Sequence, residues 1–529
     1  MARYLLVFLI ACGGGSSTPP GDAAGDASPD GAVDGPVDAP PDAPSTDPAI
    51  LTVATTAGVT ETRQDAEAHL VITGRNLDGA SSVTVGTTAA AIDSASATEV
   101  RVTLYVPAVV GPQPVTIVAS AGTITKPAAI AVTPFVVSPT GSGGLGTYGS
   151  PLGLCDPDLE LAGAGDTIEL QGGTHECGRW VNLNTGVTVA GAPGATAIVR
   201  GIADEGFGFA VIYGPDTQTT TFRDLTFAEP LLPWSIDAYG TLVVQRVHDS
   251  GGIAAFGRPA AIDHYTFTGV GPAVETDGVI QFTSSTIYCT SGDGIVARDG
   301  GSVTLDGVTV ENCATGLWIA GAPSHTGGAT VVGCDFVDNY LGIRITYGGA
   351  TVTDTTIRDD ETTPAVSSVG LWVDTADVYV ATSHILDQDH VGIRVTSPSP
   401  NNGIDDSFLD ARGIEIVGGH VGISYENMDN NLWLRHSTIR DQTEAAFQCH
   451  ALDSQTDLGR PGDPGFNTLS VTSGFALDDQ RQYESGFHRY IHANGTTLNG
   501  VSFDGQTIEG TAELAPYYRI SSFDSGIQF

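Results

Sequence analysis

Lysine is almost missing from this chain of 529 residues, since Lys126 is the only one. Chemistry that needs a lysine as a base or as an imine-forming amine is therefore excluded elsewhere. Basic residues as a class are scarce, with 21 Lys+Arg against 61 Asp+Glu and a formal net charge of −40. Such an acidic surface excludes nucleic acid as a partner and repels anionic lipid. Helical patterns are also scarce while glycine is abundant, at 68 residues, which indicates an all-β chain.

The first twelve residues indicate export. Arg3 precedes an apolar run over residues 4–10, as in a short signal peptide. The run "LIAC" that ends at Cys12 resembles the lipobox of bacterial lipoproteins, and the resemblance implies that Cys12 carries the lipid. Gly13 stands where an aspartate would retain such a lipoprotein at the inner membrane. The implied location is the outer membrane, exposed at the cell surface, with the lipid as sole anchor. An incidental cysteine in an ordinary signal is the alternative.

Two further segments precede the largest domain. Residues 13–47 are mostly Gly, Pro, Ala, Ser, Thr and Asp without a basic residue, which predicts a disordered linker. Residues 48–134 contain alternating β runs separated by turn residues, which predicts a small antiparallel β-sandwich. The stretch "LVITGRNLDGASSVTVG" and the later "VRVTLYVP" resemble the IPT/TIG immunoglobulin-like domain. That resemblance implies a spacer or binding module and no catalysis.

Residues 135–529 are built from repeats. A small residue opens the last strand of each repeat about every 22 residues, at Gly252, Ala273, Gly294, Gly316, Gly342, Gly370, Gly392, Gly422 and Ala446. Three short strands per repeat with inward apolar residues predict a right-handed parallel β-helix. These repeats, and the entry segment "AGDTIELQGGT", resemble the pectin-lyase-like superfamily. That superfamily contains lyases, hydrolases, epimerases and adhesins, so the fold alone does not fix the function.

Stacking the repeats places tryptophan and arginine alternately on the outer side of the third strand. This Trp/Arg strip comprises Trp318, Arg344, Trp372 and Arg394. Guanidinium groups stack on indole rings, and indole faces also stack on sugar rings, so the strip is a candidate carbohydrate-binding platform. Alternatively, the side chains only stabilise one another, or the insertions at 321–328 and 361–368 cover them.

A second candidate face lies on the first and second strands of the repeats between residues 378 and 440. Tyr379 and Trp433 flank Asp410, and His384 lies beside Glu415. The two aromatic residues are further candidates for sugar binding. The two carboxylates and the imidazole could catalyse glycoside hydrolysis or elimination, as a hydrolase or polysaccharide lyase would. The superfamily's hydrolase motifs are incomplete here, and a plain solvated polar face is the alternative.

The turn between the second and third strands carries a column of short polar residues, at Asn312, Asp338, Asp359, Asp387 and Asp441. Such residues commonly bond backbone groups in turns, and the stack is first a structural feature. A calcium site is the alternative. His390 and His420 fall in one register near Asp387, which makes these three a candidate divalent-metal site.

Six cysteines remain after Cys12, an even number that suggests disulfides in an exported protein. Cys155 and Cys177 close a local loop, and Cys289 and Cys313 fall in the same turn of adjacent repeats. These two pairs are the predicted disulfides.

The leading interpretation is a surface lipoprotein whose β-helix binds extracellular polysaccharide. A polysaccharide lyase or glycoside hydrolase is one alternative, and a structural surface protein or adhesin is another. The sequence leaves the oligomeric state open.

Overall fold

The computed structural model describes residues 47–106, 109–201, 209–213, 217–228, 234–360, 368–397, 407–426, 431–450, 455–481, 489–522 and 525–529. The predicted signal, Cys12 and nearly all of the predicted linker lie outside these residues. The described part is almost entirely β-structure with a single 3-10 helix, η1 (Pro157–Leu161). This confirms the all-β fold class. None of its helices is long and apolar enough to cross a membrane.

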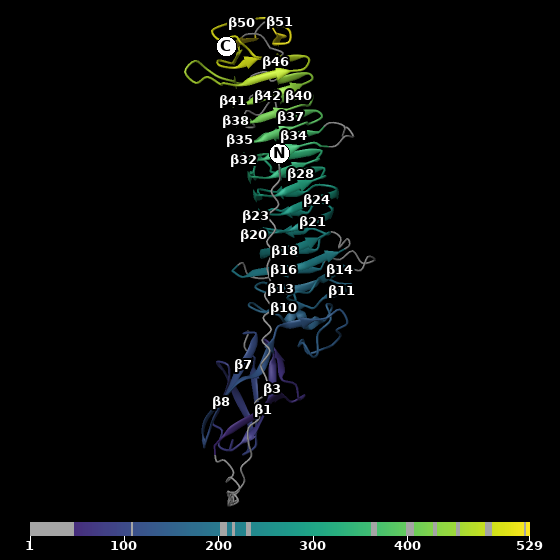
Figure 1. Ribbon diagram of the computed structural model, residues 1–529, viewed down its shortest axis with the longest axis vertical. Helices are drawn as coiled ribbons and strands as arrows, with labels where there is room; N and C mark the ends of the chain where they lie inside the picture. Colours follow the sequence, from purple (N-terminus) through teal and green to yellow (C-terminus); the bar gives the residue numbers. More distant parts are fainter. Residues whose placement is uncertain are drawn as a thin grey trace, which may run out of the picture. The chain divides into compact units, whose positions relative to one another are not determined.

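Eight strands between residues 49 and 133 form a β-structure with its own core (Figure 1). Their order is β1-β3-β6-β5-β4-β7-β8-β2, and every pairing is antiparallel except β2 with β8. Alternate residues point inward, as in β3, so Leu70, Ile72, Val102 and Ile117 are fully buried. The strands are β1 (Ala49–Thr55), β2 (Glu61–Arg63), β3 (Glu67–Arg75), β4 (Ser82–Val85), β5 (Thr88–Ala95), β6 (Glu99–Tyr105), β7 (Gly111–Ala119) and β8 (Gly122–Thr133).

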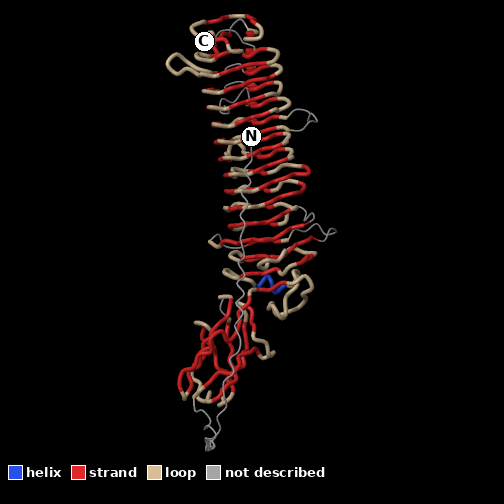
Figure 2. Tube along the Cα trace, in the orientation of Figure 1, coloured by secondary structure: helices blue, strands red, loops and turns tan. Residues whose placement is uncertain are grey.

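From residue 135 onward the chain winds into a parallel β-helix, whose coils lie one on the next in Figures 1 and 2. The first-strand stack comprises β9 (Phe135–Val137), β10 (Thr167–Leu170), β13 (Thr188–Gly191), β16 (Thr219–Ala228), β18 (Thr241–Asp249), β20 (Ala260–Asp263), β23 (Val279–Thr283), β26 (Ser302–Asp306), β29 (Gly327–Val332), β32 (Gly348–Thr353), β35 (Asp377–Ala381), β38 (Phe408–Arg412), β41 (Asn431–Arg435), β44 (Gln455–Asp457), β47 (Arg489–His492) and β53 (Ser525–Gln528).

Strands β16 and β18 each continue into the second-strand stack, whose other members are shorter. They are β11 (Gly173–Cys177), β14 (Ala197–Gly201), β21 (Thr266–Val270), β24 (Thr286–Ser291), β27 (Thr309–Glu311), β30 (Asp335–Val337), β33 (Thr356–Arg358), β36 (His384–Leu386), β39 (Glu415–Val417), β42 (Thr438–Gln442), β45 (Thr468–Val471) and β48 (Thr497–Leu498).

The third strands form a separate sheet on another face of the coil. Its members are β12 (Val181–Asn184), β15 (Ala210–Tyr213), β17 (Ile236–Ala238), β19 (Ile253–Ala255), β22 (Val274–Thr276), β25 (Ile295–Arg298), β28 (Thr315–Ala320), β31 (Leu341–Thr346), β34 (Val369–Asp374), β37 (Val391–Thr396), β40 (Val421–Tyr425), β43 (Ala445–Cys449), β46 (Phe475–Asp479) and β52 (Tyr518–Ile520), with β51 (Ala512–Leu514) at its edge. Strands β49 (Val501–Ser502) and β50 (Thr507–Glu509) lie near the C-terminal end.

One continuous apolar core fills the interior of the coils. Inward positions stack in register, for example Val303 on Ala329 and Ile343 on Leu371. Nearly all of these side chains are fully buried. Each buried Val, Leu or Ile contributes about 1.5–3 kcal/mol relative to an exposed one, so the stacked repeats together provide the driving force for the fold.

The turn from first to second strand is stabilised by a ladder of buried hydroxyls. Each hydroxyl donates to the carbonyl oxygen two residues earlier, at 2.8–2.9 Å, and each follows a residue with φ between 48° and 52°; the members are Ser285, Thr355, Ser383 and Ser437. Cys334 occupies the same position, and its Sγ lies 3.2 Å from the carbonyl oxygen of Val332. This free, buried thiol therefore replaces a hydroxyl in the ladder.

The predicted column of short polar residues lies in the next turn and is a feature of coil stacking. Asn312, Asp338, Asp387 and Asp441 have φ between 53° and 69°, a region that Asn and Asp tolerate better than most residues. The N–H groups of Asp338 and Asp387 donate to carbonyl oxygens of the following coil, at 2.9 and 2.8 Å. The side chain of Asn312 also donates to the Cys289 carbonyl oxygen of the preceding coil at 2.7 Å, which is the structural role that was predicted for this column.

Both predicted disulfides are present. Cys155 bonds to Cys177, with the Cα atoms 5.3 Å apart, and Cys289 bonds to Cys313, with the Cα atoms 4.9 Å apart. The second bond joins adjacent coils and so closes a loop across one full turn of the β-helix.

Candidate functional site

An aromatic face lies on the first-strand stack, as the repeat alignment predicts. Tyr379, Asp410, Trp433 and Asp457 are aligned on four successive strands, β35, β38, β41 and β44. Tyr379 is 37% exposed and Trp433 is 41% exposed, whereas Asp410 between them is only 8% exposed. The two rings therefore stand on either side of a recessed carboxylate, separated by two coil steps or roughly 10 Å.

Asp410 forms an ion pair with an arginine of its own strand. Arg412 lies two residues later, on the same side of β38, and donates from Nε and Nη2 to the two carboxylate oxygens at 2.8 and 2.9 Å. These hydrogen bonds raise the pKa of Arg412 above its ordinary value. The bidentate pair thus engages both carboxylate oxygens of Asp410.

His384 and Glu415 form a second, separate pair on the second-strand stack. Nδ1 of His384 lies 3.2 Å from Oε2 of Glu415, and Arg440 donates to Oε1 of the same carboxylate at 3.1 and 3.2 Å. Among the described residues, no contact links this group to Asp410. The three predicted catalytic residues are thus divided between two ion-pair groups.

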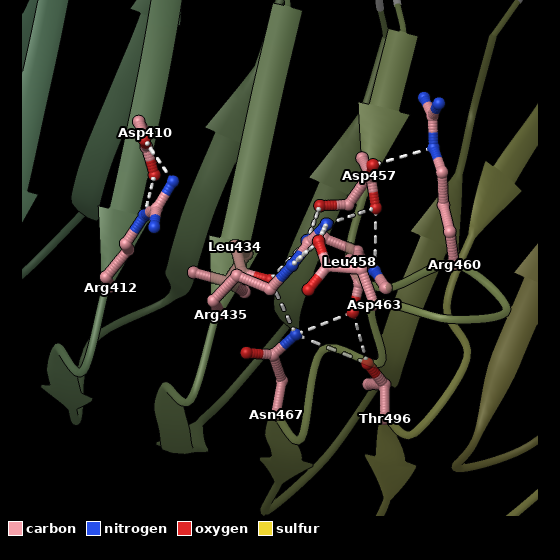
Figure 3. A network of polar contacts seen from close by, with 11 residues as sticks. Asp410, Arg412, Leu434, Arg435, Asp457, Leu458, Arg460, Asp463, Asn467 and Thr496 are labelled. Atoms are coloured by element: carbon pink, nitrogen blue, oxygen red, sulfur yellow. Dashed lines mark hydrogen bonds and ion pairs between the residues drawn. The ribbon is translucent and has the colours of Figure 1, made fainter.

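A pocket of about 300 Å³ opens beside Trp433, at the C-terminal end of the aromatic face. It is lined by Arg412, Trp433, Arg435, His436, Asp457, Arg460 and Asp463. Three of the chain's 21 basic residues thus meet in one pocket of a protein with net charge −40. Figure 3 shows the charged side chains that converge here.

The floor of this pocket is an ion-pair network centred on the buried pair Arg435 and Asp457, with the exposed Asp463 and Arg460 at its outer side. Its Nη2 contacts Asp457 at 3.0 Å and Asp463 at 2.8 Å. Its Nη1 donates to the carbonyl oxygens of Leu434 and Asp457, at 3.0 and 2.9 Å. Asp457 also contacts Arg460 at 2.7 Å, so its charge is fully balanced. Arg435 holds the pKa of Asp463 below its ordinary value.

Two polar residues on the two coils that follow Ser437, in the same register, anchor this network to the coils (Figure 3). Asn467 donates from Nδ2 to the carbonyl oxygens of Leu434 and Leu458, at 3.0 and 2.8 Å. The hydroxyl of Thr496 donates to the Leu458 carbonyl oxygen as well, at 2.8 Å. These hydrogen bonds hold the strand and the loop that carry the charged groups in place, and they thereby preorganise the pocket.

The Trp/Arg strip has the predicted register but a closed arrangement. Trp318, Arg344, Trp372 and Arg394 align on β28, β31, β34 and β37, and all four are half-buried. The Arg344 guanidinium lies 5.3 Å from the centre of one indole and 4.4 Å from that of the other. Arg298 and Arg394 lie at 5.7 and 4.9 Å on these two rings. Each indole face thus already carries a guanidinium group.

Carboxylates and hydroxyls complete the strip from within the chain. Arg344 contacts Asp374 at 3.4 Å and Arg394 contacts Glu426 at 2.8 Å. Nε1 of Trp372 donates to Thr396 at 2.8 Å. These contacts favour mutual stabilisation over sugar binding. Most of the insertion predicted to overhang the strip, residues 361–367, lies outside the described residues.

The three residues of the predicted metal site, Asp387, His390 and His420, do not gather into a ligand cluster in the part of the chain that the structure describes. The two imidazole rings do lie on adjacent coils, with centroids 6.5 Å apart and ring planes tilted by 54°. Asp387, however, has left-handed backbone torsions and belongs to the turn that joins the second and third strands. The part of the chain that the structure describes contains no group of three His, Cys, Asp or Glu residues that could hold a metal ion. The calcium alternative for the aspartate column lacks a ligand cluster for the same reason.

Four charged residues of the pocket were missed in the sequence, although signals for them exist. Arg435 is two residues after Trp433 on one strand and therefore shares its face. Asp457 continues the Tyr379–Asp410–Trp433 column by one coil. Arg460 and Asp463 lie in the Gly/Pro-rich loop "GRPGDPG", whose conformation periodicity does not predict.

The coils that carry this site match a known family model. The model, described as a right-handed beta helix region, matches residues 268–458. These coils therefore form a right-handed parallel β-helix, as the repeats predict. A search of curated proteins finds no match.

Several solved structures are similar in part. A mannuronan C-5 epimerase A-module of Azotobacter vinelandii is 14% identical with a TM-score of 0.45, over 62% of this chain and 93% of that one. A surface adhesin of Streptococcus pneumoniae is 11% identical with a TM-score of 0.33, over 55% and 83%. The catalytic unit of an α-1,3-glucanase of Streptomyces thermodiastaticus is 11% identical with a TM-score of 0.32, over 81% and 89%. None of these similarities identifies a substrate for this chain.

Proposed function

We propose that the β-helix binds an extracellular polysaccharide along the face formed by Tyr379, Trp433 and the adjoining arginine-lined pocket. The observation that carries the proposal is the pair of exposed rings on one column of strands. A flat ring offers an apolar surface to the C–H face of a sugar, and these two rings share one column of strands instead of being scattered. The spacing of the rings suits neighbouring positions on an extended chain rather than a single small molecule.

The pocket beside Trp433 supplies the polar half of the proposed site. Arg412 and Arg460 are exposed at its rim, while Arg435 is buried in its floor. Rigid guanidinium groups can donate to sugar hydroxyls, or to an acidic substituent, with little reorganisation. A few fixed polar groups beside an apolar surface are the usual composition of a ligand site.

Binding is favoured over cleavage because the carboxylates of Asp410 and Glu415 are already engaged in ion pairs. Glycoside hydrolysis needs one carboxyl group that can donate a proton and a second that acts as base or nucleophile. Asp410 is paired with Arg412, and Glu415 is paired with His384 and Arg440. Both carboxylates therefore already have charged hydrogen-bond partners within the chain. A lyase or hydrolase remains the second proposal, and the assay below distinguishes it by its products.

We further propose that the protein is a cell-surface lipoprotein of the outer membrane with an IPT/TIG-like spacer. The run "LIAC" at Cys12 and the acidic stretch that follows support an anchor and a tether. Labelling with a radioactive fatty acid should mark the wild type and leave Cys12→Ala unlabelled. Labelling of both proteins alike would remove the lipid anchor from the proposal.

The central test is affinity electrophoresis and calorimetry against a panel of neutral and acidic polysaccharides. We expect at least one polysaccharide to bind, and the double variant Tyr379→Ala/Trp433→Ala to weaken binding by at least about tenfold, which corresponds to about 1.4 kcal/mol. Trp372→Phe, which changes the strip instead, is the matched control and should bind like the wild type. New reducing ends or unsaturated products would favour the enzymatic alternative. Equal binding by the double variant would refute the proposed face.

A further inference from the structure

A tight turn forms the outer side of the pocket beside Trp433, hereafter the Trp433 pocket. Arg460 and Asp463 exchange both of their backbone N–H to C=O hydrogen bonds across this turn, at 3.0 and 2.9 Å. Pro461 and Gly462 lie between them, and the φ of +93° at Gly462 is typical of a type II turn. Residues that face each other in this way direct their side chains to the same side. The turn therefore holds a guanidinium group and a carboxylate next to each other.

Each of these two side chains uses one part of its polar group within the chain and leaves the other part free. Nε of Arg460 contacts Asp457 at 2.7 Å, and Oδ2 of Asp463 accepts from Arg435 at 2.8 and 3.1 Å. Among the described residues, the two terminal nitrogens of Arg460 and Oδ1 of Asp463 have no partner. The two side chains are 45% and 74% exposed, so a ligand in the pocket can reach these atoms.

The charges around the pocket balance, and this balance decides the class of ligand. Three arginines are matched by three carboxylates, namely Arg412 by Asp410, and Arg435 and Arg460 by Asp457 and Asp463. An acidic sugar would find no unmatched cation here, and the net charge of −40 on the whole chain would repel it. A cationic sugar would find no unmatched carboxylate. A neutral sugar fits these groups, because each of its hydroxyls can both donate and accept a hydrogen bond.

An exposed aromatic pair continues the edge of the pocket onto the next coil. His436 lines the pocket, and the ring of Phe466 stacks on it with centroids 5.5 Å apart and planes 21° apart. Phe466 is 59% exposed, and its φ of +50° is a left-handed conformation that strains bulky residues. Gly413 and Gly495 occupy the same register position on neighbouring coils. Strained residues of this kind are typical of ligand-contacting positions.

We propose that the Trp433 pocket binds one residue of a neutral polysaccharide through two adjacent hydroxyls, a proposal that rests on the proposed function and names its ligand class. One hydroxyl accepts from Arg460 and the other donates to Asp463. Both hydrogen bonds involve a charged group and are therefore stronger than bonds between neutral partners. Phe466 provides a further apolar contact for the sugar chain where it leaves the pocket.

The test is calorimetry of the full chain with neutral polysaccharides (glucans, mannans and galactans) and acidic ones (alginate, polygalacturonate and hyaluronate). We expect at least one neutral polysaccharide to bind, and every acidic one to bind at least about tenfold more weakly. The affinity for the neutral polysaccharide should change by less than about twofold between about 50 and 500 mM sodium chloride, because salt does not screen an uncharged ligand.

Arg460→Ala and Asp463→Ala should each weaken binding of the neutral polysaccharide by at least about tenfold. Arg358→Ala is the matched control, because the Arg358 side chain is similarly exposed, at 41%, and pairs with Asp360 at a different coil. This variant should bind like the wild type. Phe466→Gly should weaken binding several-fold and keep the melting temperature of the wild type, because glycine adopts this φ without strain.

Preferential binding of an acidic polysaccharide, a strong dependence on salt, or unchanged affinity in Arg460→Ala and Asp463→Ala would each overturn the proposal. If an acidic polysaccharide bound and lost affinity in Tyr379→Ala/Trp433→Ala, the aromatic face would stand as the binding site and only its ligand class would be wrong. If no polysaccharide bound, the proposed function would fall as well.

Discussion

Trp372→Ala is the most informative perturbation, because it separates a structural tryptophan from a binding one. The indole loses two guanidinium neighbours, at 4.4 and 4.9 Å, worth about 1 kcal/mol each. It also loses the hydrogen bond to Thr396, worth about 1 kcal/mol. Its half-buried ring packs against a small apolar cluster, and loss of that contact adds about 1–2 kcal/mol. We expect a local destabilisation of about 4–5 kcal/mol.

The assay for this change is native-state hydrogen exchange of the amides in β31, β34 and β37. A long repeat structure need not unfold in one step, so a single free energy of unfolding is poorly defined, whereas exchange reports each coil. We expect faster exchange in these three strands, little change in β20 and β23, and unaltered polysaccharide binding.

Trp433→Ala provides the matched control. This ring is more exposed and makes an edge contact with Phe408, without a guanidinium neighbour among the described contacts. We expect a stability loss of only about 1–2 kcal/mol together with impaired polysaccharide binding. If Trp372→Ala abolished binding while exchange in its coil stayed unchanged, the assignment of the two tryptophans would be reversed.

Three further predictions concern stability. Burial raises the pKa of Asp166 from 3.8 to about 6. Its contribution to the free energy of unfolding is therefore fully present below pH 3.8 and is lost as the pH rises through about 6. The melting temperature should fall over that pH range, and Asp166→Asn should flatten the dependence of the melting temperature on pH. Loss of the Cys289–Cys313 bond should cost about 3–4 kcal/mol, seen as a lower melting temperature of the Cys289→Ser/Cys313→Ser variant than of the wild type without reductant. Cys334→Ser should be nearly neutral in thermal melts, because the hydroxyl can make the ladder contact, whereas Cys334→Ala should cost about 1 kcal/mol.

The coil register could be predicted from the sequence because one small residue and two apolar alternations recur in every repeat. The alignment of Tyr379 with Asp410 and Trp433, and that of His384 with Glu415, follows from this periodicity alone. Contacts between side chains two residues apart on one strand can be predicted from the sequence in the same way. Arg412 lies two residues from Asp410 and therefore shares its side of the strand, a signal that would have identified the pair.

The remaining parts of the site depend on loops and on burial, which periodicity does not encode. The backbone of the Gly/Pro-rich loop brings Arg460 and Asp463 back over Asp457, and the turn types there set the position of each side chain. The prediction of an open Trp/Arg platform assumed fully exposed rings. Arg and Trp instead alternate on adjacent coils, and each guanidinium group covers a face of the neighbouring ring. The coil spacing allows this because it is close to the separation between a guanidinium group and the ring on which it stacks.

The same comparison explains why binding and stability should be separable on this protein. In the Trp/Arg strip, each indole ring or guanidinium group stacks on a planar group of the next coil, so these interactions stabilise the fold itself. On the first-strand face, the recessed Asp410 separates Tyr379 from Trp433, and two coil steps are too far for the two rings to stack on each other. Their apolar surfaces therefore remain for a ligand, while Arg435 fixes the adjacent pocket from within the coil stack. A variant that fills the gap, Asp410→Tyr, should stack the column as in the strip and so reduce polysaccharide binding while increasing coil protection; weaker protection together with intact binding would contradict this account.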